Sequence, residues 1–171
     1  NGYLGFLGVS WMDLEAGTAI NHGAVRPFPF GRMGLPASAD AGDIDQRRGK
    51  LHLSFQLEPG ARVLSVDAPD FDHGRSLSGR FRLEQPADDR MVIATPFAGA
   101  PRAFYYNQKI NCMPVTGELR LGGEQIRFEP ASAFAVLDWG AGSGPMTTPG
   151  TGPRHRAWLR AAGLASTWAM A

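Results

Sequence analysis

Apolar and polar residues alternate along most of this chain, and that alternation constrains its fold more than any other feature. Between residues 51 and 57, Leu and Phe at odd positions are separated by His, Ser and Gln, and residues 77–83 repeat the pattern. Successive side chains of a β-strand point to opposite faces, so the pattern predicts strands with one buried face. No segment from 1 to 139 has an amphipathic helical period of useful length. An all-β fold with antiparallel pairing is therefore predicted.

The same alternation, with its turn residues, predicts where the strands lie. Pro59-Gly60 and Gly122-Gly123 each separate the two arms of a hairpin. The segment 27–49 is rich in Pro, Gly and Asp and is expected to be an ordered loop. The expected strands are 3–14, 51–57, 61–66, 76–84, 91–96, 103–111, 115–121, 124–129 and 133–138. The side chains expected to face the core are Leu51, Leu53, Phe55, Leu77, Phe81, Leu83, Ile126 and Phe128.

Composition narrows the class of protein and of partner. Hydrophobic residues make up 43% of the 171 residues and charged residues 19%, which is typical of a globular chain. The formal net charge is +1, so no broad basic surface favours a nucleic-acid partner. No apolar run approaches the ~20 residues of a membrane-spanning helix.

Cysteine and histidine usage gives no support for a metal or redox site. The single cysteine, Cys112, cannot form an internal disulfide, and a buried, unreactive thiol is its expected state. This usage favours a reducing compartment and predicts a cytoplasmic protein. The four histidines lack metal-ligand spacing, and there is no phosphate-binding glycine loop, dinucleotide fingerprint or GxSxG elbow. We therefore expect no metal and no cofactor.

A row of polar side chains in the strand expected at 103–111 is the first candidate site. Alternation places Tyr105, Asn107, Lys109 and Asn111 on one face of that strand. If the row faces a barrel interior, it could hold the polar head of a ligand or polarise a carbonyl group. The alternative is that these side chains only satisfy one another and the loop backbone, as buried polar groups usually do.

Asp138 is the candidate acid or base, because it stands between apolar neighbours in the last expected strand. A carboxylate buried there needs a partner, and Lys109 and Arg32 are the natural candidates. A shifted pKa would make Asp138 a general acid or base, with Lys109 and Tyr105 as further catalytic groups. A purely structural ion pair is the alternative.

Three more side chains complete the candidate ligand site. Arg32 lies in a Gly-Arg-Met-Gly turn and could bind a carboxylate or phosphate with both guanidinium arms. The alternative is that Arg32 only ties its loop to backbone carbonyls. Tyr106 and Trp139 are expected to contribute aromatic surface, and Trp139 should also anchor the end of its strand in the core.

Several segments together resemble the family catalogued as domain of unknown function number 2804. They are GYLGFLGVSWMDLEAG (2–17), PFPFGRMGLPASADAGD (27–43), MVIATPFAGAPRAFYYNQKINCMPVTGELRLGG (91–123) and FAVLDWG (134–140). The FYYNQKINCMP string is the most specific of these. Family members are longer than this chain, and the chain starts without Met inside an apolar stretch. The resemblance therefore implies an internal fragment, with the C-terminal half of the same protein missing.

The family in turn resembles two-lobed lipocalin-like proteins such as carotenoid hydratases, tocopherol cyclase and fungal Diels–Alderases. This relation implies a lipocalin-like (calycin-type) β-barrel or sandwich, here incomplete, with a small apolar or amphipathic molecule as its ligand. Cavities of such barrels carry apolar and aromatic side chains with a few polar groups. Two alternatives stay open: an enzyme acting on a lipid or isoprenoid by acid–base chemistry, and a structural β-domain without a ligand.

The tail after Gly140 differs in composition and pattern from the rest of the chain. A family member would continue approximately as RGVWPYDNTWYWASASG, whereas this chain continues as AGSGPMTTPGTGPRHRAW. A back-translation of 142–158, read in a shifted frame, gives VWPYDNTWYWASASG. We therefore expect a β-domain fragment at 1–139 and an out-of-frame tail at 140–171 that follows a single-base deletion. Such a tail should be disordered or form a helix without functional meaning.

Overall fold

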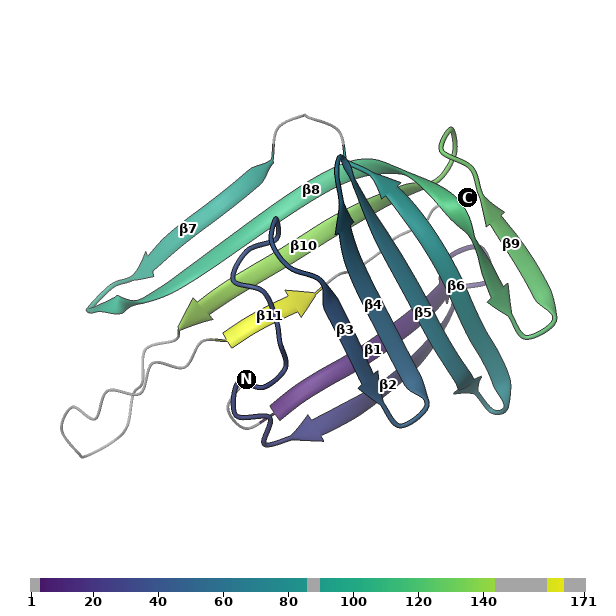
Figure 1. Ribbon diagram of the computed structural model, residues 1–171, viewed down its shortest axis with the longest axis horizontal. Coiled ribbons are helices and arrows are strands. Elements are labelled where there is room, and N and C mark those ends of the chain that lie inside the picture. Colours follow the sequence, from purple (N-terminus) through teal and green to yellow (C-terminus); the bar gives the residue numbers. More distant parts are fainter. Residues whose placement is uncertain (1–3, 86–89, 144–159, 165–171) are drawn as a thin grey trace.

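The computed structural model describes residues 4–85, 90–143 and 160–164, which form β-strands and contain no helix (Figure 1). β1 (Leu4–Asp13) and β2 (Thr18–Pro27) form a hairpin of their own. The larger sheet consists of β3 (Ile44–Arg48), β4 (Leu51–Glu58), β5 (Ala61–Asp72), β6 (Arg75–Glu84), β7 (Met91–Phe97), β8 (Ala100–Leu121), β9 (Glu124–Phe128), β10 (Phe134–Ser143) and β11 (Arg160–Leu164). Each of these strand pairs is antiparallel, which confirms the predicted fold class at that level.

The larger sheet is curved and open (Figure 1). Its strands follow the order β11-β10-β8-β6-β5-β4-β3, and β7 and β9 also pair with β8. The first half of β8 pairs with β7 and β10, and its second half pairs with β6 and β9. A barrel would require β3 and β11, the two ends of this path, to pair with each other. In the part of the chain that the structure describes they do not, so the expected barrel is not closed.

A β-bulge at Cys112 divides β8 into two parts whose side chains alternate in opposite phase. One residue separates Ala135 from Leu137 on β10, whereas two residues separate their partners Met113 and Ile110 on β8. Cys112 has φ of 55°, in the left-handed region, where an extra residue in a strand can be placed. As a result, Ile110 and Met113 both point into the core. Odd-numbered residues of β8 point outward before the bulge and inward after it.

The core lies between the inner face of the larger sheet and the β1–β2 hairpin, which crosses behind β3 to β6 in Figure 1. The hairpin side chains that pack against the core are Leu7, Val9, Trp11, Ile20 and Ala24. The expected core residues are all part of this packing. Buried among them are Leu51, Leu53, Leu77, Leu83 and Phe128, and partly buried against the same cluster are Phe55, Phe81 and Ile126.

Arg62 holds the loop between β2 and β3 against the inner face of the sheet. The register places it between Leu57 of β4 and Leu83 of β6, on an otherwise apolar face. Its guanidinium donates to the carbonyl oxygen of Ala39 at 2.7 Å and lies 3.4 Å from a carboxylate oxygen of Asp40. Burial lowers the pKa of Arg62, and the negative charge of Asp40 opposes that effect. The loop is thus ordered, as expected, and one of its anchors is a buried cation.

Before residue 50, two strands lie where the sequence predicts none. β2 falls between the expected strand at 3–14 and the expected loop, and β3 falls inside that loop. Both strands are mostly exposed, and neither carries a continuous buried stripe. Their pairing with β1 and β4, respectively, makes them strands, and this contribution leaves little trace in hydrophobic alternation.

The tail contains a strand at a position where its composition favours a helix or disorder. β10 continues to Ser143, and Arg160–Leu164 forms β11, which pairs with Asp138–Gly142 of β10. An unpaired edge of β10 offers backbone N–H and C=O groups that a further strand can satisfy. The rest of the expected tail, 144–159 and 165–171, lies outside the described residues. Its assignment to a shifted reading frame stays a prediction.

Candidate functional site

Lys109, Asp138 and Asn107 form a hydrogen-bonded cluster on β8 and β10. The register places Asp138 directly opposite Lys109, whose Nζ donates to Asp138 Oδ2 at 2.5 Å. Asn107 Nδ2 donates to Asp138 Oδ1 at 2.5 Å and to the carbonyl oxygen of Trp139 at 3.0 Å. Of the two partners that the sequence offers for Asp138, Lys109 is therefore the one that forms the ion pair. The Lys109 and Asp138 side chains are 35% and 28% exposed, so the pair is open to solvent on one side.

This cluster lies on the outer face of the sheet, which corrects the expectation that the polar row faces a barrel interior. Tyr105, Asn107 and Lys109 alternate with Ile110, and the Ile110 side chain belongs to the core. The three polar residues therefore share one face, as predicted, but it is the face turned away from the β1–β2 hairpin. The row does not face an interior because the sheet is open and encloses no cavity on this face.

Asn107 contains an acceptor for which the described residues supply no donor. Its Nδ2 faces two oxygens, those of the Asp138 carboxylate and the Trp139 carbonyl, so the reversed amide would set oxygen against oxygen. The remaining Oδ1 is buried and lacks a hydrogen-bond partner within the described residues. A buried acceptor without a donor costs about 1–3 kcal/mol. A donor from water or from a bound molecule would remove that cost.

The ion pair keeps both of its groups charged at neutral pH. Burial pushes the pKa of Asp138 upward, but the hydrogen bonds from Lys109 and Asn107 and the charge of Lys109 outweigh it, and the pKa falls below its ordinary value. The hydrogen bond to Asp138 raises the pKa of Lys109, against a smaller opposing effect of desolvation. A general acid or base works best with a pKa near the operating pH. These directions move both groups away from that condition.

The three aromatic residues of the predicted site lie on opposite faces of the sheet. Tyr105 is 43% exposed on the face of the cluster. Tyr106 and Trp139 contact each other edge to face, with ring centroids 5.8 Å apart, on the opposite, inner face. Trp139 is buried, as expected of an anchor.

Arg32 and Asn111 do not join the cluster. Arg32 is exposed in the loop after β2, where its backbone N–H donates to the Pro29 carbonyl, and no interaction between its side chain and Asp138 is observed. Asn111 is exposed beside the bulge. Cys112, expected to be buried, is exposed because the bulge turns it out of the strand.

Exposed apolar residues of β7 lie beside the cluster. Met91 pairs in register with Lys109, and Ile93 pairs with Asn107, so both lie next to the polar row on the same face. Met91 is 55% exposed and Ile93 is 38% exposed. The sequence predicts the strand but not this neighbourhood, because register between distant strands is a tertiary property.

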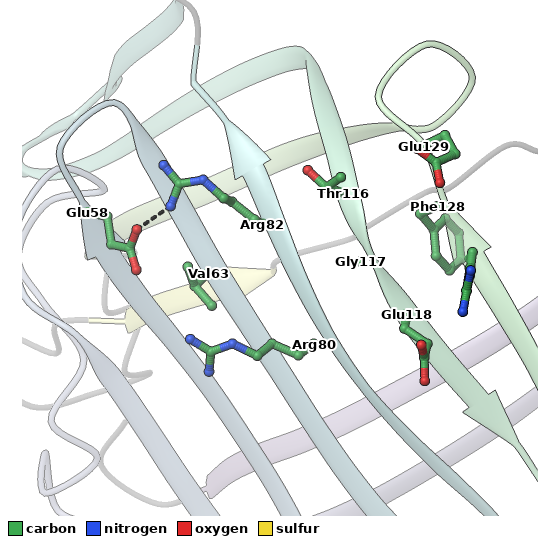
Figure 2. Close-up of a pocket in the computed structure, with 10 residues that line it drawn as sticks. Glu58, Val63, Arg80, Arg82, Thr116, Gly117, Glu118, Phe128 and Glu129 are labelled. Atoms are coloured by element: carbon green, nitrogen blue, oxygen red, sulfur yellow. Dashed lines mark hydrogen bonds and ion pairs between the residues drawn. The ribbon is translucent and has the colours of Figure 1, made fainter.

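Apart from the cluster, the outer face has a recess over β4, β5, β6, β8 and β9 (Figure 2). Its volume is about 500 Å³. Its lining includes three arginines (Arg80, Arg82 and Arg127), three carboxylates (Glu58, Glu118 and Glu129) and the apolar residues Val63 and Phe128. The alternating arginines of β6 are consistent with the solvent-facing side expected for that strand. The contribution of β9 could not be read from the sequence, since it depends on how β8 pairs with both β6 and β9.

Within the described residues, no group of three or more His, Cys, Asp or Glu side chains could hold a metal ion. The same part of the chain contains no helix of the length and apolarity needed to cross a bilayer.

Comparison with known proteins relates the chain to a family. The model of a family described as Domain of unknown function (DUF2804) matches residues 1–152. No curated protein and no solved structure matches the chain. The family match covers the cluster on β8 and β10 and extends past Gly140 into the first part of the tail.

Proposed function

This chain belongs to the DUF2804 family, as its motifs implied, and we propose that it binds a small amphipathic molecule on the outer face of β7, β8 and β10. The observation that carries the proposal is the buried Oδ1 of Asn107, which has no donor within the described residues. A ligand hydroxyl or amide N–H would supply that donor. The lipocalin-like relation implied by the family resemblance is consistent with such a ligand.

The surroundings of Asn107 suit an amphipathic molecule better than a fully polar or a fully apolar one. The Lys109–Asp138 pair offers charged groups to a polar head, and the exposed Met91 and Ile93 offer apolar surface to the remainder. Ligand sites commonly combine a mostly apolar surface with a few placed polar groups. Since Oδ1 is buried, a donor reaches it only after neighbouring side chains shift.

Acid–base catalysis is less well supported than binding. Asp138 and Lys109 hold each other in their charged forms, so neither is set to exchange a proton near neutral pH. In the binding proposal the same pair has a different role, since it orients Asn107 and presents charge to the ligand. Tyr105 contributes polar and aromatic surface beside the pair.

Titration with 1-decanol tests the proposal, because this probe joins a single hydroxyl to an apolar chain. Two-dimensional NMR should show a shift of the Asn107 side-chain amide together with backbone amides of β7 and β8. Asn107→Ala should weaken binding at least about tenfold, the equivalent of a hydrogen bond worth about 1.4 kcal/mol. Met91→Ser, which keeps the polar cluster, should weaken binding by a smaller factor.

Asn111→Ala is the matched control, because it removes an amide from the same strand at an exposed position outside the cluster. It should leave decanol binding unchanged. Decanol binding that is equal in Asn107→Ala and in the unchanged protein would overturn the assignment of this site. No small molecule on the purified protein by mass spectrometry, combined with no decanol response, would favour a structural β-domain.

A further inference from the structure

The carboxylate of Asp40 accepts hydrogen bonds from side chains that lie far apart in the sequence. Its Oδ2 accepts from Arg90 Nη1 at 2.6 Å and from Gln108 Nε2 at 3.3 Å. Its Oδ1 lies 3.4 Å from Nη2 of Arg62. Arg62 belongs to β5, Gln108 belongs to β8, and Arg90 directly precedes β7. One carboxylate of the loop between β2 and β3 thus brings two guanidinium groups and an amide together.

These donors lie on the inner face of the sheet, opposite the outer-face cluster. Gln108 alternates with Lys109 of that cluster along β8, and its side chain is buried. Arg62 lies in register between two leucines of the inner face. The Asp40 side chain is 44% exposed and that of Arg90 is 33% exposed, so the group is open to solvent on one side. A small molecule can therefore reach these donors without entering the core.

Asp40 fits this set of donors only in part. Its contacts with Arg62 and Gln108, at 3.4 and 3.3 Å, are longer than the roughly 2.7–2.9 Å typical of charge-assisted hydrogen bonds. The short side chain of Asp40 limits its reach, and the adjacent backbone is held because the Ala39 carbonyl accepts from Arg62. The carboxylate of a free molecule is not tied to this backbone and can approach all three donors closely.

An apolar surface leads away from the donors along the same face. Alternation places Tyr106 and Phe104 on the face of Gln108, and the register sets Val92 of β7 opposite Gln108. Val92 is 52% exposed and Phe104 is 41% exposed. From Gln108 to Phe104 the strand extends about 14 Å, since each residue adds about 3.4 Å. A hydrocarbon chain of medium length can lie along this row.

We propose that Arg62, Arg90 and Gln108 form a second binding site, on the inner face, for the carboxylate of an amphipathic acid, and that Asp40 competes with the acid for these donors. Guanidinium groups bind carboxylates with strong, charge-assisted hydrogen bonds, and the amide of Gln108 adds a neutral donor. The hydrocarbon part of the acid lies along the apolar row of β7 and β8. Binding displaces Asp40 and releases its part of the loop from Arg90 and Gln108.

Titration with decanoate, followed by NMR of side-chain N–H groups, tests this site. Decanoate should shift the Nε–H signals of Arg62 and Arg90 and the amide signals of Gln108. Backbone amides of residues 36–43 should shift with them, because Asp40 leaves its donors. Acetate should bind at least about tenfold more weakly than decanoate, since it lacks the hydrocarbon part. Decylammonium has the same chain and the opposite charge, and equal shifts of these signals by decylammonium would overturn the proposal.

Removal of the competing charge should increase the affinity for decanoate. Asp40→Asn keeps the shape of the side chain and should strengthen binding about five- to tenfold, because the donors are then free for the ligand. A purely structural role of Asp40 predicts no such gain. Glu15→Gln makes the same change in net charge at an exposed position in the turn between β1 and β2, and it should leave the affinity unchanged. No gain in Asp40→Asn, or an equal gain in Glu15→Gln, would overturn the proposal.

Arg90→Gln is a second, independent variant, at a partly exposed side chain. It should weaken decanoate binding at least about fivefold, because it removes the donor with the shortest contact. Arg48→Gln makes the same change in net charge on β3 and should have no effect. Equal weakening by both variants would show a general charge effect and overturn the proposal. Asn107→Ala should leave the decanoate shifts of Arg62 and Arg90 unchanged, which separates this site from the one on the outer face.

Discussion

Gly117 sits where β6 and β8 approach so closely that no side chain fits. A Cβ atom at this position would collide with the carbonyl oxygen of Arg80 and lie 2.9 Å from Cα of Phe81, and backbone cannot move aside cheaply. We expect Gly117→Ala to lower the free energy of unfolding by about 1–3 kcal/mol. Gly123→Ala is the matched control, because a Cβ there has no neighbour within 4 Å, and it should change stability by less than about 0.5 kcal/mol. Denaturant unfolding of both variants measures these changes in the free energy of unfolding. Equal changes in the two variants would contradict the close approach of β6 and β8 at Gly117.

Asp138 should make stability depend on pH in the acid range. Its pKa in the folded protein lies below the ordinary value of 3.8, so its contribution is fully present above that value. The contribution is lost as the pH falls through the lower, folded pKa. Asp138→Asn should therefore be less stable than the unchanged protein at neutral pH, and the difference should shrink below pH 3.8. Thermal unfolding measured across that range tests this, and a constant difference at every pH would argue against the ion pair.

At the scale of elements, the buried cation Arg62 anchors the loop between β2 and β3. Arg62→Met keeps the length of the side chain and suits its apolar neighbours, but it leaves the Ala39 carbonyl without its donor. We expect a loss of about 1–3 kcal/mol in unfolding free energy. Hydrogen exchange should also become faster in the loop at residues 36–43 than in β4. Arg48→Met, at an exposed position of β3, should leave exchange in the loop unchanged. Unchanged loop protection in Arg62→Met would show that the loop is held by other contacts.

At the scale of the whole molecule, the tail remains the part whose origin is open to test. The sequence predicts that one base is missing near the codon for Gly140, and the described backbone of β11 does not address that prediction. Sequencing the source gene through this region should reveal one additional base and a continuation close to VWPYDNTWYWASASG. An unchanged reading frame in the source gene would contradict the prediction, and the tail would then be native sequence.

The sequence alone determined the antiparallel β-fold, the two hairpins at the Pro59 and Gly122 turns, and the residues of the core. It could do so because alternation and turn chemistry are local properties of a strand. It also indicated that Asp138 needs a partner, with Lys109 and Arg32 as candidates, since a buried carboxylate requires one.

Only the tertiary structure decided which way these residues face and what lies beside them. The bulge at Cys112 reverses which side chains of β8 point inward and which point outward, and the hydrophobic pattern of the sequence does not predict this reversal. The open sheet places Asn107 on an outer face, and register brings Ile93 beside it. Register and closure depend on pairing between strands far apart in the chain, whereas the sequence pattern reports only what each strand requires of its own two faces.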